Sequence, residues 1–100
     1  MKRDLKIGDI VRAKDNCYPY YNIKGKIVDF ERGDPNNFLV EFFESIEYGH
    51  DGYRSTKSGK RYRKGYCWYC YGYEMELVHS NLDLYLKSKE KAWQIRINPL

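Results

Sequence analysis

The stretch GKIVDFERGDPNNFLVEFF, residues 25–43, predicts two strands joined by a turn. Residues 25–32 and 38–43 are rich in β-branched and aromatic side chains, while Gly, Asp, Pro and Asn at 33–37 interrupt the extended pattern. Similar short runs occur at residues 10–14, 66–71 and 75–78. Five short strands in so short a chain predict a mostly β fold, a small five-stranded barrel or tightly curled sheet over residues 1–79.

The length and charge of the chain limit its domain count and its partners. One hundred residues suit one domain. Residues 1–50 carry eight Lys or Arg and nine Asp or Glu, whereas residues 51–100 carry ten and five. The net charge of +4 therefore belongs to the second half, which favours an anionic partner and excludes an acidic mimic of DNA.

Hydrophobicity and cysteine content indicate where the protein works. No run approaches the roughly 20 apolar residues that span a bilayer, and the start MKRDLKIGD lacks the apolar core of a secretory signal. Cys17, Cys67 and Cys70 are an odd number without disulfide-framework spacing. We expect free thiols, no membrane partner and a cytoplasmic location.

Residues 54–73, RSTKSGKRYRKGYCWYCYGY, join a basic run to an aromatic run. Residues 54–64 hold six cations and no acid, and residues 62–73 hold six aromatic rings. The cations lie in a long loop, residues 44–65, where Ile46 is the only aliphatic side chain, so we expect the loop to bury little. Cations attract phosphates and carboxylates, and exposed rings stack on bases or anchor protein interfaces. The predicted ligand-binding residues are Arg54, Lys57, Lys60, Arg61, Arg63, Lys64, Tyr69, Tyr71, Tyr20, Tyr21, His50 and Asp51.

Alternation along the predicted strand 66–71 divides its side chains between two faces. Trp68 and Cys70 share one face, and we expect Trp68 to anchor the core. Tyr69 and Tyr71 then lie on the outer surface. A second aromatic group, YPYY at residues 18–21, either rims the same ligand pocket or covers an open end of the barrel.

The pair Cys67-x-x-Cys70 suggests a zinc or redox site, but the strand pattern opposes both. Three residues apart on a strand, the two thiols point to opposite faces. A redox pair needs a helix N-terminus, and YGYEMELV (residues 71–78) is strand-like. We therefore expect buried thiols, no metal and no cofactor.

Two further motifs carry polar groups. GHDG, residues 49–52, presents His50 and Asp51 either to a ligand or proton, or simply to close a turn. In the second case Asp51 bonds backbone amides of its own turn and His50 packs on a neighbouring ring. SGKR, residues 58–61, lacks the remaining residues of a nucleotide phosphate loop. The sequence therefore predicts a binding module and not an enzyme.

The C-terminal extension, residues 80–100, fits two structures. Ser80-x-x-Asp83 resembles a helix capping box, whereas Leu82, Leu84 and Leu86 alternate as in a hairpin. Either form carries an apolar stripe that docks on the barrel or on a second copy of the chain. The second case predicts a homodimer.

Six segments together resemble a known family. They are KIGDIVRAKDN (6–16), GKIVDF (25–30), FLVEFFE (38–44), GHDG (49–52), GYCWY (65–69) and YEMELV (73–78). The order resembles small SH3-like barrel proteins of bacteriophages, distantly similar to the mind-bomb-type SH3-like domain. The resemblance implies a five-stranded barrel used for binding, in which GHDG and CWY form a shared structural or binding edge. The basic insert 54–64 and the tail lie outside the common pattern.

The resemblance favours an anti-defence function. A phage-type binding protein would block a host defence protein, or sequester a phosphate-bearing ligand, through the basic loop and the Tyr-rich face. The alternative is a nucleic-acid-binding small β-barrel. A third class is a structural module that dimerises through its tail.

Overall fold

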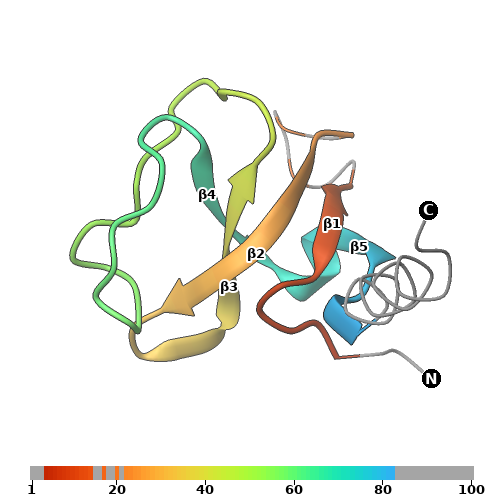
Figure 1. Ribbon diagram of the computed structural model, residues 1–100, viewed down its shortest axis with the longest axis horizontal. Coiled ribbons are helices and arrows are strands. Elements are labelled where there is room, and N and C mark those ends of the chain that lie inside the picture. The colour runs from red at the N-terminus through yellow and green to blue at the C-terminus, as the bar shows by residue number, and fades with distance from the viewer. Residues whose placement is uncertain (1–3, 15–16, 18–19, 21, 83–100) are drawn as a thin grey trace, which may run out of the picture.

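The computed structural model describes residues 4–14, 17, 20 and 22–82 (Figure 1). Five strands and one short 3-10 helix are defined within these residues, which confirms the mostly β class. The elements are β1 (Ile10–Ala13), β2 (Lys24–Glu31), β3 (Asp34–Phe42), β4 (Cys67–Tyr71), η1 (Gly72–Glu74) and β5 (Met75–His79). Each strand overlaps a β-rich run of the sequence, although β3 begins four residues before its predicted start.

The five strands form one antiparallel sheet in the order β4-β3-β2-β1-β5. Val11 of β1 pairs with Gly25 of β2 on one side and Leu77 of β5 on the other. In the described part of the chain, β4 and β5 do not pair, so of the two expectations, a barrel or a tightly curled sheet, the five strands form an open sheet and do not close into a barrel. The reason is local: the outer edge of β4 pairs with the loop, through Cys67 and His50, instead of with a strand.

The main core lies on the inner face of the sheet. Val11, Ile27 and Val40 are fully buried there, and Phe42 is nearly so. Burying one such side chain stabilises the fold by roughly 1.5–3 kcal/mol. Trp68 packs against this cluster while remaining partly exposed, so the prediction of its face is confirmed.

A bulge in β2 gives the outer face a buried region of its own. Ile27 pairs with Val40, and Asp29 pairs with Leu39. Two residues advance on β2 while one advances on β3, so Val28 is the extra, bulged residue. The bulge shifts Asp29 to the face opposite Ile27. Leu39 and Asp29 are 0% and 2% exposed, respectively, although no strand covers them.

The long loop, residues 44–65, covers this outer face (Figure 1). Thr56 is fully buried and pairs with Glu31, and Ile46 is 8% exposed. The amide of Lys57 donates to the Phe30 carbonyl (2.8 Å), and within the loop the Tyr62 amide donates to the Asp51 carbonyl (2.8 Å). Of this loop only Ile46, Gly52 and Thr56 are buried, which agrees with the expectation of little to bury, and the loop nevertheless packs on the sheet as a second layer.

The predicted turn at residues 33–37 is shorter than expected. Gly33, with φ of +86°, follows β2, and β3 begins at the next residue. Asp34 pairs with Glu31 while Phe38 pairs with Phe30, so the three residues between them bulge out of the ladder. Strand pairing therefore extends into the segment that was expected to be turn.

Residues 83–100 lie outside the described residues, and with them most of the predicted helix or hairpin and its role in a homodimer. Within the described residues, no helix has the length and apolar character needed to cross a membrane.

Candidate anion-binding surface

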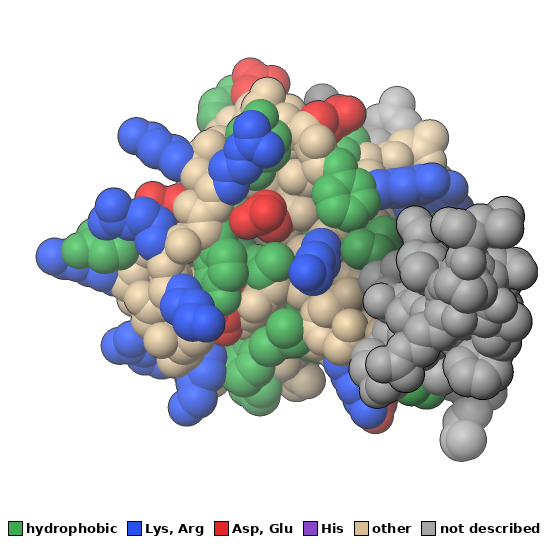
Figure 2. All heavy atoms as spheres, in the orientation of Figure 1, with side chains coloured by type: hydrophobic (Ala, Val, Ile, Leu, Met, Phe, Trp, Pro, Cys, Tyr) green, Lys and Arg blue, Asp and Glu red, His purple; other side chains and the backbone are tan. Residues whose placement is uncertain are grey.

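Six cations of the loop form what we call the basic surface. All six side chains are exposed, and Figure 2 shows Lys and Arg side chains gathered where the loop lies in Figure 1. They are Arg54, Lys57, Lys60, Arg61, Arg63 and Lys64. Within the described residues, Arg61 is the one member with a carboxylate ion pair, to Asp51 at 3.5 Å. Most of the positive charge is therefore available to a partner.

Aromatic rings hold the three arginines of this surface. The guanidinium carbons of Arg61 and Arg54 lie 3.9 and 5.1 Å from the centre of the Tyr53 ring. That of Arg63 lies 3.7 Å from the centre of the Tyr66 ring. Each exposed cation–π contact contributes about 0.5–1 kcal/mol. Side chains held in this way lose less conformational entropy when a ligand binds.

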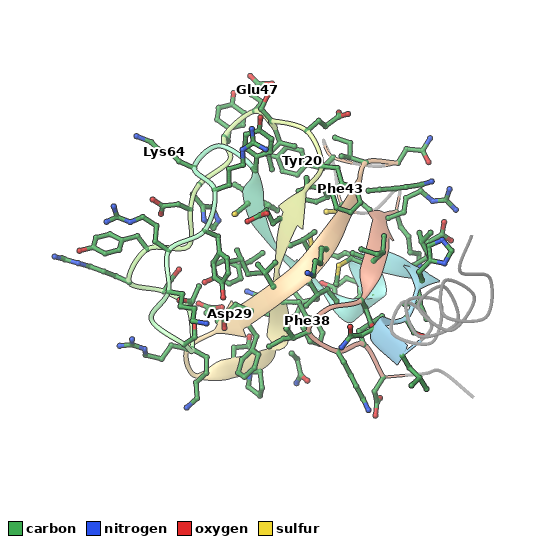
Figure 3. All side chains as sticks on the ribbon, in the orientation of Figure 1. Tyr20, Asp29, Phe38, Phe43, Glu47 and Lys64 are labelled. Atoms are coloured by element: carbon green, nitrogen blue, oxygen red, sulfur yellow. The ribbon has the colours of Figure 1, made fainter. Side chains whose placement is uncertain are left out.

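The buried carboxylate of Asp29 anchors the loop from below (Figure 3). Its Oδ2 accepts hydrogen bonds from the hydroxyls of Ser58 and Tyr62 (2.8 Å for Tyr62), and its Oδ1 accepts the Phe30 amide (2.9 Å). The Tyr62 hydroxyl also lies 3.1 Å from the Val28 carbonyl. Burial alone would raise the pKa of Asp29, but the hydrogen bonds from Ser58, Phe30 and Tyr62 together outweigh it and lower the pKa. Asp29 is therefore a buried anion bonded directly to the segment that carries the cations.

In the GHDG turn, the side chains of His50 and Asp51 accept hydrogen bonds from backbone amides of the same turn. His50 Nδ1 accepts the Gly52 amide (3.0 Å), and the imidazole lies 5.8 Å from the Trp68 ring and 5.4 Å from the Tyr69 ring. Asp51 Oδ1 accepts the Tyr53 amide (2.9 Å). Burial lowers the pKa of His50, and the nearby Asp51 carboxylate opposes this shift. The imidazole and carboxylate thus shape the turn that carries Tyr53.

The structure places the two outer-face tyrosines in different surroundings. Tyr69 is half-buried beneath the loop, where its hydroxyl lies 2.7 Å from the Ser55 hydroxyl. Tyr71 is exposed, donates to Asp34 (2.9 Å) and stacks on Tyr73 with ring centres 5.8 Å apart. Tyr69 therefore supports the loop, and Tyr71 contacts residues outside it.

The prediction that Tyr20 contacts a ligand is wrong. Its side chain is 2% exposed and its hydroxyl donates to the Glu47 carbonyl (Figure 3). The ring centre lies 5.2 Å from that of Trp68 and 6.1 Å from that of Phe42. In a core with few aliphatic side chains, this ring fills the space between them. Tyr21, the other predicted contact from this segment, lies outside the described residues.

The cysteines occupy opposite faces of β4, as alternation predicts. Cys70 Sγ lies in the main core, 3.6 Å from Cys17 Sγ, whereas Cys67 Sγ lies under the loop, 3.4 Å from the Arg63 carbonyl oxygen. Burial raises the pKa of Cys67 to about 12. Within the described residues, no group of three or more His, Cys, Asp and Glu side chains is arranged to hold a metal ion.

Several residues that build the surface escape sequence reasoning. Asp29 lies in no motif, and SGKR does not predict the hydrogen bond from Ser58 to Asp29; the bulge that turns Asp29 under the loop has no sequence signal here. Tyr53 could have been found, because it directly precedes Arg54 in a cationic stretch, where a ring commonly supports a guanidinium.

No protein-family model, curated protein or solved structure matches this chain. The basic surface itself is therefore the strongest indication of what the protein does.

Proposed function

We propose that this protein is a non-enzymatic binding protein whose basic surface binds a phosphate-bearing ligand. The observation that supports this most directly is six exposed cations within residues 54–64, of which Arg61 alone pairs with a carboxylate in the described structure. Three of the six are arginines, whose planar guanidinium groups suit bidentate binding of phosphate oxygens. The ring contacts of Tyr53 and Tyr66, with the Asp29 anchor, order these groups before the ligand arrives.

The resemblance of GHDG and GYCWY to bacteriophage SH3-like proteins extends the proposal to an anti-defence role. The protein would then sequester a phosphate-bearing ligand of the host, or block a host defence protein, in the host cytoplasm. The pairing of β1 with both β2 and β5 supports the SH3-like assignment within this proposal.

Calorimetric titration with long-chain inorganic polyphosphate tests the binding proposal. A polyglutamate of equal charge distinguishes phosphate binding from general attraction to anions. The key variant is Lys57→Gln/Lys60→Gln, and its matched control is Lys6→Gln/Lys14→Gln, which removes the same charge from exposed positions outside the loop. We expect polyphosphate to bind and the loop variant to bind about tenfold or more weakly, since each lost phosphate contact releases about one counterion less. Absence of binding, or equal losses in both variants, would contradict the proposal.

The anti-defence role has its own test. Host cells that express the wild-type chain should allow a defence-restricted phage to plate more efficiently than cells that express Lys57→Gln/Lys60→Gln. Equal plating with the wild type and the empty vector, across host strains with different defence systems, would remove this part of the proposal.

A further inference from the structure

We infer that the phosphates belong to the backbone of a nucleic-acid duplex, which the basic surface binds without stacking on bases. This inference rests on the proposed function and specifies its ligand. Three features of the described residues carry it: the length of the cationic row, its exposed position, and the contacts that already occupy its tyrosines.

The row is too long for a single phosphate group. The Lys57 amide donates to the Phe30 carbonyl (2.8 Å), and the Arg63 amide donates to the Glu41 carboxylate (3.3 Å). Phe30 pairs with Phe38, three residues before Glu41 on β3, so these two cationic residues lie about 10 Å apart along the strand. A DNA duplex carries one phosphate charge per roughly 1.7 Å of its axis when both strands are counted. That length of duplex therefore presents about six phosphates, enough for the five cations that are not paired to Asp51.

The cations stand on an exposed loop instead of lining a hollow. The molecule has a hollow of about 940 Å³, lined mostly by apolar groups such as Phe30 and Phe38 but also by Asp4, Lys6 and Lys14. Of the described residues that line it, none belongs to the basic surface. Small ligands such as single nucleotides usually have most of their surface buried in a concave site. An exposed row of cations suits an extended polyanion instead.

The tyrosines next to the cations, at residues 53, 62, 66 and 69, already make contacts, whereas Tyr48, earlier in the same loop, is 74% exposed. Arg54 and Arg61 lie against Tyr53, and Arg63 lies against Tyr66. Tyr62 is bonded to Asp29, and Tyr69 is half-buried against Ser55. Proteins that bind single strands offer exposed rings to successive bases. Because the rings beside the cations support arginines and the loop, the basic surface offers chiefly charge, and a duplex provides one negative charge per roughly 1.7 Å of its axis.

Fluorescence anisotropy with the full chain tests the inference. The probes are a labelled 20-base-pair DNA duplex, either of its single strands, and a duplex RNA of the same sequence. If five cations bind phosphates, with Arg61 left to Asp51, log K should fall against log salt with a slope of about −4.5. Affinity for the duplex should then drop about 500-fold between 50 and 200 mM salt. Single strands give a smaller slope of about −0.7 per contact, so with equal affinities at 1 M salt the single strand should bind roughly tenfold more weakly than the duplex at 0.1 M.

Variants assign the effect to residues. Lys57→Gln/Lys60→Gln should reduce the slope by about 1.8, equally for duplexes of different sequence, while Lys6→Gln/Lys14→Gln leaves it unchanged. Tyr53→Ala should weaken binding to the duplex and the single strand by the same factor, because the ring positions arginines and does not stack on bases. The salt slope and the duplex preference are measured on the wild type, so they test the inference even if a variant fails to fold.

The outcomes separate this inference from the proposed function. Preference for a duplex over the single strand, with the predicted slope, supports it, and comparison of the two duplexes shows whether DNA or RNA is the source. Equal or tighter binding of the single strand overturns the inference, as does absence of duplex binding while polyphosphate binds. In both cases the proposed function stands. Failure to bind any of these polyanions removes both.

Discussion

Replacing Asp29 by asparagine should loosen the loop without changing its shape. Asparagine has nearly the size of aspartate and can keep one carbonyl oxygen for the Phe30 amide. The hydroxyls of Ser58 and Tyr62, however, lose the charged acceptor that they now share. Hydrogen bonds to charged groups contribute about 1.5–3 kcal/mol and neutral ones about 0.5–1.5. Removing a buried charge recovers part of this difference, so we expect a net loss of about 1–2 kcal/mol.

Thermal unfolding and amide hydrogen exchange measure this loss. For a domain of this size, a loss of 1 kcal/mol lowers Tm by roughly 4–8 °C. Protection of the Lys57 amide, which bonds the Phe30 carbonyl, should fall about tenfold because the loop opens more often. The control is Asp34→Asn, since Asp34 also accepts a tyrosine hydroxyl, that of Tyr71, but at an exposed site. It should cost less than about 0.5 kcal/mol.

Acid provides a second readout of the same contact. The pKa of Asp29 is below its ordinary value of 3.8. Its stabilising contribution is therefore complete above pH 3.8 and is lost as the pH falls through the lower folded-state pKa. The difference in stability between wild type and Asp29→Asn should shrink in that acidic range. If the two Asp→Asn variants unfold at the same temperature, or the difference persists in acid, Asp29 is not the anchor described above.

Three further predictions concern the packing around the loop. All three cysteines are buried, and the pKa of Cys67 is raised to about 12. A thiol reagent at pH 8 should therefore label fewer than one cysteine per native chain but all three after denaturation. Fast labelling of the native chain would contradict this. A Cβ at Gly49 would collide with the Gly65 carbonyl, so Gly49→Ala should cost about 2–3 kcal/mol in urea unfolding. In Gly72→Ala the nearest atom, of Leu5, is 3.9 Å away, and an equal cost there would refute the packing. Because burial lowers the pKa of His50, stability should decline as the pH falls from 6.5 towards the folded-state value, and His50→Gln should remove that slope.

Alternation along β4 was enough to predict which side chains face the core. Because the strand is regular, a spacing of three puts Cys67 and Cys70 on opposite faces, and the structure has them there. The same reasoning fails for β2, where the bulge at Val28 reverses the face of every residue beyond it. Asp29 would otherwise share the face of Ile27, and its role beneath the loop depends on that one irregularity.

The sequence was enough to predict which cations form the candidate site, but not which tyrosines are exposed there. Charge density alone identifies the basic surface, since six cations without an acid must be exposed or paired. A tyrosine, by contrast, suits a core, a hydrogen bond or a ligand equally well, and tertiary contacts decide between these roles. Tyr20 lies in the core and Tyr69 lies beneath the loop, whereas Tyr71, in the same aromatic run as Tyr69, is exposed.

The loop is part of the fold and not an appendage to it, and this bears on how it binds. On the outer face, Gly52 packs against the fully buried Leu39, and the fully buried Cys67 lies beside the Arg63 carbonyl, so opening the loop would expose apolar surface. That burial, with the Asp29 carboxylate below, offsets the mutual repulsion of six like charges in one short segment. A ligand that brings further negative charge relieves the same repulsion and meets cations already in place. Binding therefore requires little ordering of the loop, so its free energy depends chiefly on electrostatic attraction and on salt.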